Sequence, residues 1–157
     1  MRLPIVAFFL VALLAPALAA GQTITVIGQG GRTATLAAKD LADLPRATIQ
    51  VGAPAKAYEG PTLTAVLRQV GAPAGPMLHG KPVKDYVVVT GADGFSAVLS
   101  LAETDAYLHK GAVILADTAA GAPLAAHEGP WRLIVDGDLK PSRSVRNVVK
   151  IELEAAP

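Results

Sequence analysis

The densest group of chemically active side chains lies in residues 140–146, near the C-terminus. This segment, Lys-Pro-Ser-Arg-Ser-Val-Arg, contains three cations and two hydroxyls. Guanidinium groups bind oxyanions through parallel N–H donors, and hydroxyls and backbone N–H groups in a turn add further donors. The segment therefore predicts a site for a phosphate or another oxyanion, with Lys140, Arg143, Ser144 and Arg146 as its binding residues.

The same arginines have an alternative, purely structural use. Asp136 and Asp138 precede them by a few residues, and arginine–carboxylate pairs are common on protein surfaces. Composition alone favours this pairing of Arg143 and Arg146 over an anion site. Both alternatives stay open at this point.

Other familiar catalytic patterns do not occur in the chain. It contains no cysteine, which excludes disulfides, thiolate metal ligands and cysteine nucleophiles. The three histidines, His79, His109 and His127, lack the spacing of a zinc-binding helix. No serine lies in a Gly-x-Ser-x-Gly motif. The glycines at 28, 30 and 31 precede an expected strand, which indicates a hairpin turn and not a nucleotide-binding loop. We therefore expect no catalytic residue and no metal site.

Short elements separated by Gly and Pro must position these residues. Runs of β-branched and alternating apolar residues predict roughly eight strands, over residues 23–27, 32–36, 48–51, 86–90, 95–99, 113–116, 131–135 and 147–153. The turn Asp93-Gly94 is typical of a hairpin between two of them. Strands and helices do not alternate strictly, so we predict an α+β fold dominated by sheet and not a doubly wound fold.

Three short helices complete the prediction. The first covers residues 39–44 and ends at Pro45. The second covers residues 61–70, with Pro61 in its first turn and an apolar stripe formed by Leu63, Val66, Leu67 and Val70. The third begins at a capping box, Ser100 to Glu103, and is expected to reach about Leu108.

The N-terminus has the features of a cleavable secretory signal. Arg2 gives a positive start, residues 3–15 are apolar, and Ala17-Leu18-Ala19 is the small-x-small pattern of a cleavage site. An uncleaved anchor is the less favoured alternative, since a bilayer span needs about 20 apolar residues. We expect a signal peptide over residues 1–19, one domain over residues 20–157 with no later membrane span, and a periplasmic or secreted product.

The charge balance argues against one class of partner. The chain has 14 basic and 13 acidic residues, and Arg2 is the only charge in residues 1–19, so residues 20–157 carry 13 of each sign. Nucleic-acid-binding domains are usually strongly basic, because they must neutralise phosphates along a backbone. We expect no nucleic-acid partner.

The order of motifs resembles the sulfite-oxidase-type oxidoreductase molybdopterin-binding domain family over nearly the whole chain after the signal. The similar segments are residues 36–45, residues 58–73 with their Tyr-x-Gly-x-x-Leu pattern, the turn at 91–95, residues 121–124 with 129–135, and Arg143-Ser144-Val145-Arg146. The last resembles the family's Arg-x-Val-Lys segment at the phosphate of the pterin. The resemblance implies the family's sheet-dominated fold and a possible molybdopterin cofactor.

The resemblance also implies which catalytic feature is missing. Catalytic members bind molybdenum through a cysteine thiolate, and Val51 stands at that position here. Phe95 replaces a hairpin tyrosine that often lines the family's active site. We therefore expect a non-catalytic exported domain that binds an anionic small molecule or a periplasmic or membrane protein.

Two alternatives to this prediction stay open. The chain could be a genuine molybdopterin oxidoreductase whose metal is held by the dithiolene alone, without a protein thiolate. It could also be an accessory or sensory partner of a membrane-bound regulator.

Overall fold

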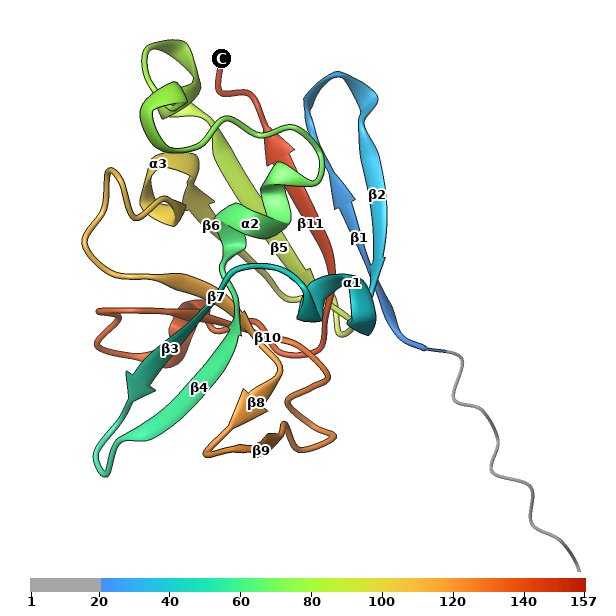
Figure 1. Ribbon diagram of the computed structural model, residues 1–157, viewed down its shortest axis with the longest axis vertical. Helices are drawn as coiled ribbons and strands as arrows, with labels where there is room; N and C mark the ends of the chain where they lie inside the picture. The colour runs from blue at the N-terminus through green and yellow to red at the C-terminus, as the bar shows by residue number, and fades with distance from the viewer. Residues whose placement is uncertain (1–20) are drawn as a thin grey trace, which may run out of the picture.

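A computed structural model describes residues 21–157; the expected signal peptide lies outside the described residues. A mixed five-stranded sheet forms one side of the molecule (Figure 1). Its strand order is β2 (Thr33–Ala37), β1 (Thr23–Ile27), β11 (Val148–Glu154), β5 (Tyr86–Gly91) and β6 (Ser96–Ser100). Only β1 and β11 pair in parallel, and this pairing joins the two ends of the domain. Buried residues alternate with half-buried ones along β5 and with exposed ones along β6, because one face of the sheet covers the main core.

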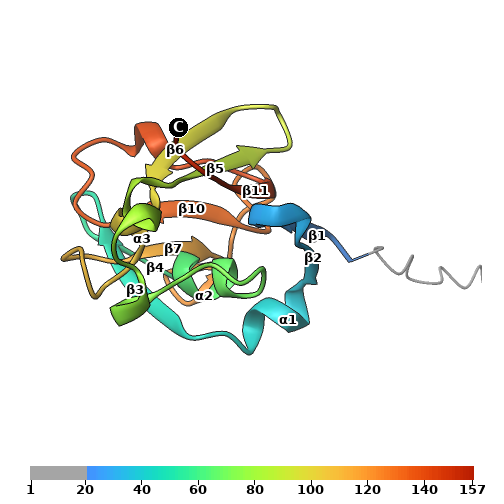
Figure 2. The ribbon, with the colours of Figure 1, turned by 90° about the horizontal axis from the view of Figure 1, so that it is seen from above.

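A two-stranded antiparallel ribbon, β7 (Val113–Ala116) and β10 (Arg132–Val135), forms the centre of the molecule. All eight of its residues are buried. Leu133 and Val135 belong to the main core, whereas Ile134 belongs to a second, smaller core. Figure 2 shows the ribbon between the five-stranded sheet and strands β3 and β4. Burial on both faces explains why this part of the sequence is apolar without alternation.

The second sheet covers the other side of the ribbon. Its order is β3 (Arg46–Val51), β4 (Lys56–Pro61), β8 (Thr118–Ala119) and β9 (Ala122–Pro123). Gly60 allows β4 to approach β7 closely, since a Cβ atom there would lie 2.1 Å from the carbonyl oxygen of Leu115. The eight predicted strands are present, and β4, β8 and β9 were missed.

Residues 21–157 contain three α-helices, as predicted, but all three are shorter than expected. They are α1 (Ala38–Ala42), α2 (Leu63–Arg68) and α3 (Leu101–Thr104). The start of α2 at Pro61 was wrong, because Pro61 pairs with Arg46 in the second sheet and Thr62 caps the helix by accepting the N–H of Ala65.

The extension of α3 to Leu108 was also wrong. The Ser100 hydroxyl caps α3 at the predicted place, accepting the Glu103 N–H at 3.0 Å. The helix then ends because the Asp105 carboxylate accepts the N–H groups of Tyr107 and Gly75, which turns the chain away.

The connections within the described part of the chain contain four short 3-10 helices: η1 (Gln29–Gly31), η2 (Gly75–Met77), η3 (Lys81–Lys84) and η4 (Pro141–Arg143). The last of them lies in the predicted anion-binding segment. Within residues 21–157, no helix is long and apolar enough to cross a membrane. The predicted α+β fold dominated by sheet is confirmed.

Candidate functional site

Arg132 is the only charged residue in the two strands of the central ribbon. It begins β10 and is 7 % exposed. Because β10 alternates between two cores, Arg132 lies on the same side as Ile134, toward Tyr58 of β4. A buried guanidinium is unfavourable unless its donors are matched by acceptors. We therefore ask which donors of Arg132 have an acceptor and which do not.

Two side chains share one nitrogen of Arg132. Its Nη1 donates to the Tyr58 hydroxyl at 3.1 Å and also to Oε1 of Glu128. The guanidinium carbon lies 5.3 Å from the centre of the Tyr58 ring, and Nζ of Lys56 lies 5.1 Å from the same ring. The second oxygen of Glu128 is 3.8 Å from Lys56 Nζ. One carboxylate and one aromatic ring therefore lie among two cations, so this cluster retains net positive charge.

The Nε atom of Arg132 is buried and has no hydrogen-bond partner among residues 21–157. A buried donor without an acceptor costs about 1–3 kcal/mol. Buried donors in folded proteins nearly always have a partner, so an exception points to a ligand or a solvent molecule. Arg132 is thus an incompletely satisfied cation in an otherwise apolar ribbon.

Arg132 lines a cavity of about 200 Å³ together with Arg146. Ser142, Ser144 and Phe95 also line it. The only acidic residue in its lining is Asp93, whose Oδ1 already accepts the Phe95 N–H at 3.0 Å. Two arginines and two serines line one small cavity, and guanidinium groups and hydroxyls are the donors that a phosphate or a similar oxyanion requires.

Arg146 is positioned by the turn that leads into β11. The next residue, Asn147, has a left-handed backbone (φ 46°), and its carbonyl accepts the Ala92 N–H at 2.9 Å. The carbonyl of Arg146 packs against Gly91 at the end of β5, where a Cβ atom would lie only 2.5 Å away. Arg146 is exposed and has no carboxylate partner among residues 21–157.

Arg143 has a different role from Arg146. Its Nη2 and Nε donate to the two oxygens of Asp138 at 2.7 and 3.1 Å, and its Nη1 lies 2.9 Å from Glu103 on α3. The hydrogen bonds that Arg143 donates to Asp138, and then to Glu103, raise the pKa of Arg143 above its ordinary value. The structural alternative, pairing with Asp138, is therefore confirmed for Arg143, which lines neither this cavity nor its neighbour.

A larger cavity of about 440 Å³ adjoins the first, and the two share Pro141 and Ser144. Lys140 and Val51 line this second cavity. Val51 ends β3, ninety-three positions before Ser144 in the sequence. Of the four predicted binding residues, Lys140, Ser144 and Arg146 line these adjoining cavities. The backbone N–H of Ser144 is not free for a ligand, because it donates to Pro141 within η4.

Sequence reasoning missed Arg132 as a site residue. Its signal was a single cation inside the apolar run Trp131 to Val135. A charge at the start of a buried strand must be matched by partners or by a ligand. No pattern in the sequence, however, places Tyr58 and Glu128 beside it.

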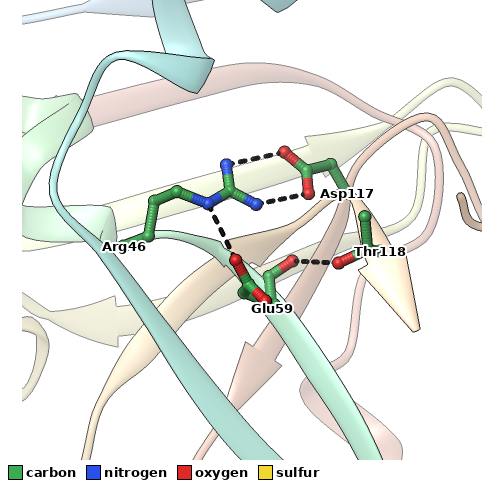
Figure 3. A network of polar contacts seen from close by, with 4 residues as sticks. All are labelled: Arg46, Glu59, Asp117 and Thr118. Carbon is green, nitrogen blue, oxygen red and sulfur yellow. Dashed lines mark hydrogen bonds and ion pairs between the residues drawn. The ribbon is translucent and has the colours of Figure 1, made fainter. Parts of the chain in front are cut away.

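A second arginine network is structural. Arg46 on β3 donates to both oxygens of Asp117 at 2.7 and 3.0 Å and to Glu59 at 3.2 Å (Figure 3). The hydrogen bonds that Arg46 donates to Asp117 are the main cause that raises the pKa of Arg46. Thr118 donates to the Glu59 carbonyl at 3.4 Å. The Nε, Nη1 and Nη2 atoms of Arg46 each donate to a carboxylate. These bonds link β3 to β4 and to the residue before β8.

Metal-binding groups are lacking in the part of the chain that the structure describes. No three His, Cys, Asp or Glu side chains within residues 21–157 lie close enough to hold a metal ion. Val51, at the position where the resemblance implies a thiolate, offers only methyl groups. Within residues 21–157, the residues that line the two cavities therefore include no cluster of three possible metal ligands.

The chain is similar in fold to a solved structure and matches a known protein family. No curated protein matches the chain. Among solved structures, it is similar to the sulfane dehydrogenase SoxCD from Paracoccus pantotrophus, with a TM-score of 0.63 and 18 % sequence identity. That match covers 85 % of this chain but only 38 % of the SoxCD chain. Residues 15–157 match the family described as the oxidoreductase molybdopterin binding domain. The family resemblance is therefore confirmed, and the chain belongs to the oxidoreductase molybdopterin binding domain family.

Proposed function

We propose that this protein binds a phosphate-bearing anion between Arg132 and Arg146 and that it does not carry out molybdenum redox chemistry. The observation that carries the proposal is the buried Nε of Arg132, which has no partner within residues 21–157, in a residue that lines the smaller cavity. Arg146 supplies a second guanidinium without a carboxylate partner in the same described part of the chain. An oxyanion that bridges both groups would satisfy these donors.

Molybdopterin, the cofactor that the family implies, fits this site only in part. Its phosphate matches the two arginines and the hydroxyls of Ser142 and Ser144. Its metal end does not fit, because the soft thiolate that tunes such a metal is replaced by the methyl groups of Val51. The absence of cysteine anywhere in the chain leaves no substitute ligand of that kind.

We further propose that the domain acts in the periplasm or outside the cell. The proposal rests on the charged start, apolar stretch and small-x-small pattern of residues 1–19. The lack of cysteine is compatible with such a compartment, since no thiol is at risk of oxidation there.

Isothermal titration calorimetry with inorganic phosphate tests the binding proposal. Arg146→Ala removes a charge-assisted donor from an exposed position, so we expect affinity to fall about tenfold with an unchanged melting temperature. Arg68→Ala removes an exposed arginine from α2, away from this cavity, and is the matched control. Equal affinity of wild type and Arg146→Ala for phosphate would refute the site.

A further inference from the structure

The larger cavity beside the phosphate site has a different chemical character. Its floor contains Ile49 and Val51 from β3 and Ile134 from β10. Leu139, on the loop between β10 and η4, lines the same cavity although it is 97 % exposed. An aliphatic side chain gains no stability from such a position in the free protein, so Leu139 is available to cover a bound molecule.

The charges around the larger cavity do not favour an anion. Its ionisable side chains are Asp136, Asp138 and Lys140. Arg143 already binds both oxygens of Asp138. Asp136 has no cation partner within residues 21–157 and opposes the charge of Lys140. The two adjoining cavities thus differ in charge, because cations dominate the smaller one.

The larger cavity also contains the valine that replaces the thiolate expected in a catalytic member of the family. Val51 supplies no metal ligand at that point, and its methyl groups favour contact with apolar atoms. The two cavities share Pro141 and Ser144 in their linings, so a molecule bound in one lies next to the other.

We propose that the ligand is a phosphate monoester with an uncharged, largely apolar body, bound without a metal. The phosphate lies between Arg132 and Arg146, and the body lies in the larger cavity against Val51 and Leu139. The inference rests on the proposed function, since it assumes that the smaller cavity holds the phosphate. It adds the class of molecule attached to that phosphate.

Calorimetry with two probes separates the two proposals. Inorganic phosphate reports on the smaller cavity alone, and 1-naphthyl phosphate adds an aromatic body. We expect wild-type protein to bind 1-naphthyl phosphate at least about tenfold more tightly than inorganic phosphate, because the ring is removed from water. Failure of both probes to bind would overturn the proposed function; equal affinity for both would overturn only the present inference.

Two neutral variants locate the body of the ligand. Val51→Thr keeps the shape of the side chain and adds a hydroxyl, whereas Leu139→Asn changes an exposed residue that contributes nothing to the core. Each should reduce the advantage of 1-naphthyl phosphate about threefold or more and leave affinity for inorganic phosphate unchanged. Leu108→Asn, at another exposed leucine, is the matched control. An advantage that persists in both variants would overturn the inference.

Discussion

At the scale of single residues, the two arginines of one short segment have opposite roles. Residue types alone suggest that Arg143 and Arg146 bind the same anion. The structure instead pairs Arg143 with Asp138 and Glu103, whereas Arg146 lines the cavity with Arg132. Sequence could predict that this segment is rich in donors. It could not predict which donors were already used, because Glu103 approaches from α3, forty positions away.

Replacing Arg143 should therefore affect stability and leave binding intact. Arg143→Ala removes a bidentate ion pair with Asp138 and a single contact with Glu103 on α3, and it leaves two carboxylates without a cation. The pair is partly exposed, so we expect the free energy of unfolding to fall by about 1 kcal/mol. Urea denaturation measures this loss, and calorimetry should show affinity for inorganic phosphate within about twofold of wild type.

The pH dependence of this pair has a definite direction. The pKa of Arg143 is raised in the folded protein, chiefly by its hydrogen bonds to Asp138. A raised pKa stabilises the folded state at every pH below the ordinary value for arginine, and the effect is lost only above it. The stability difference between wild type and Arg143→Ala should therefore be equal at pH 7 and pH 10. A large loss of affinity for inorganic phosphate in Arg143→Ala would contradict the structural role that we assign to Arg143.

At the scale of elements, the alternation of apolar and polar residues predicted the strands that have one buried face. Strands β1, β5 and β6 fall where the pattern placed them. Strand β4 was missed because its sequence, Lys-Ala-Tyr-Glu-Gly-Pro, contains no β-branched residue and ends in two residues typical of turns. Gly60 is explained only by its contact with the backbone of β7, which is a tertiary feature.

Close packing between β5 and the turn before β11 should control the position of Arg146. Gly91→Ala would place a Cβ atom 2.5 Å from the carbonyl oxygen of Arg146, so that carbonyl must move. We expect a loss of about 1–3 kcal/mol in stability, as for other overpacked sites. We also expect weaker binding of inorganic phosphate, because the guanidinium moves with its backbone. Denaturation and calorimetry on one preparation measure both effects.

Gly28→Ala is the matched control for this variant. Its new Cβ atom would lie 2.8 Å from Val70, so it also overpacks the protein, but it does so away from the cavity. A similar loss of stability with unchanged phosphate affinity is expected for Gly28→Ala. If both variants bound phosphate as wild type does, the packing of Gly91 would not position Arg146.

At the scale of the whole molecule, the fold brings together segments that are distant in sequence. Val51 lies at the end of the second sheet, and Ser144 lies in the turn that leads to the first. The resemblance of ordered motifs predicted the family, and membership in that family is confirmed. The charge difference between the two cavities could not be predicted, because it depends on how Asp136, Asp138 and Arg143 are arranged in space.

Metal content is the property of the whole protein on which the proposed function depends most. The family resemblance implies that catalytic members tether molybdenum through a cysteine thiolate, and this chain has no cysteine. We expect native protein from a cofactor-competent host to contain less than about 0.1 molybdenum atom per chain by elemental mass spectrometry, since nothing in the polypeptide replaces that ligand. Val51→Cys should restore no sulfite oxidation on its own, because Asp136 and Leu139 still line the cavity. A cysteine-containing member of the family, expressed in the same host, shows that molybdenum is available. Stoichiometric molybdenum in the wild-type protein would mean that the dithiolene alone retains the metal, and the domain would then be an oxidoreductase.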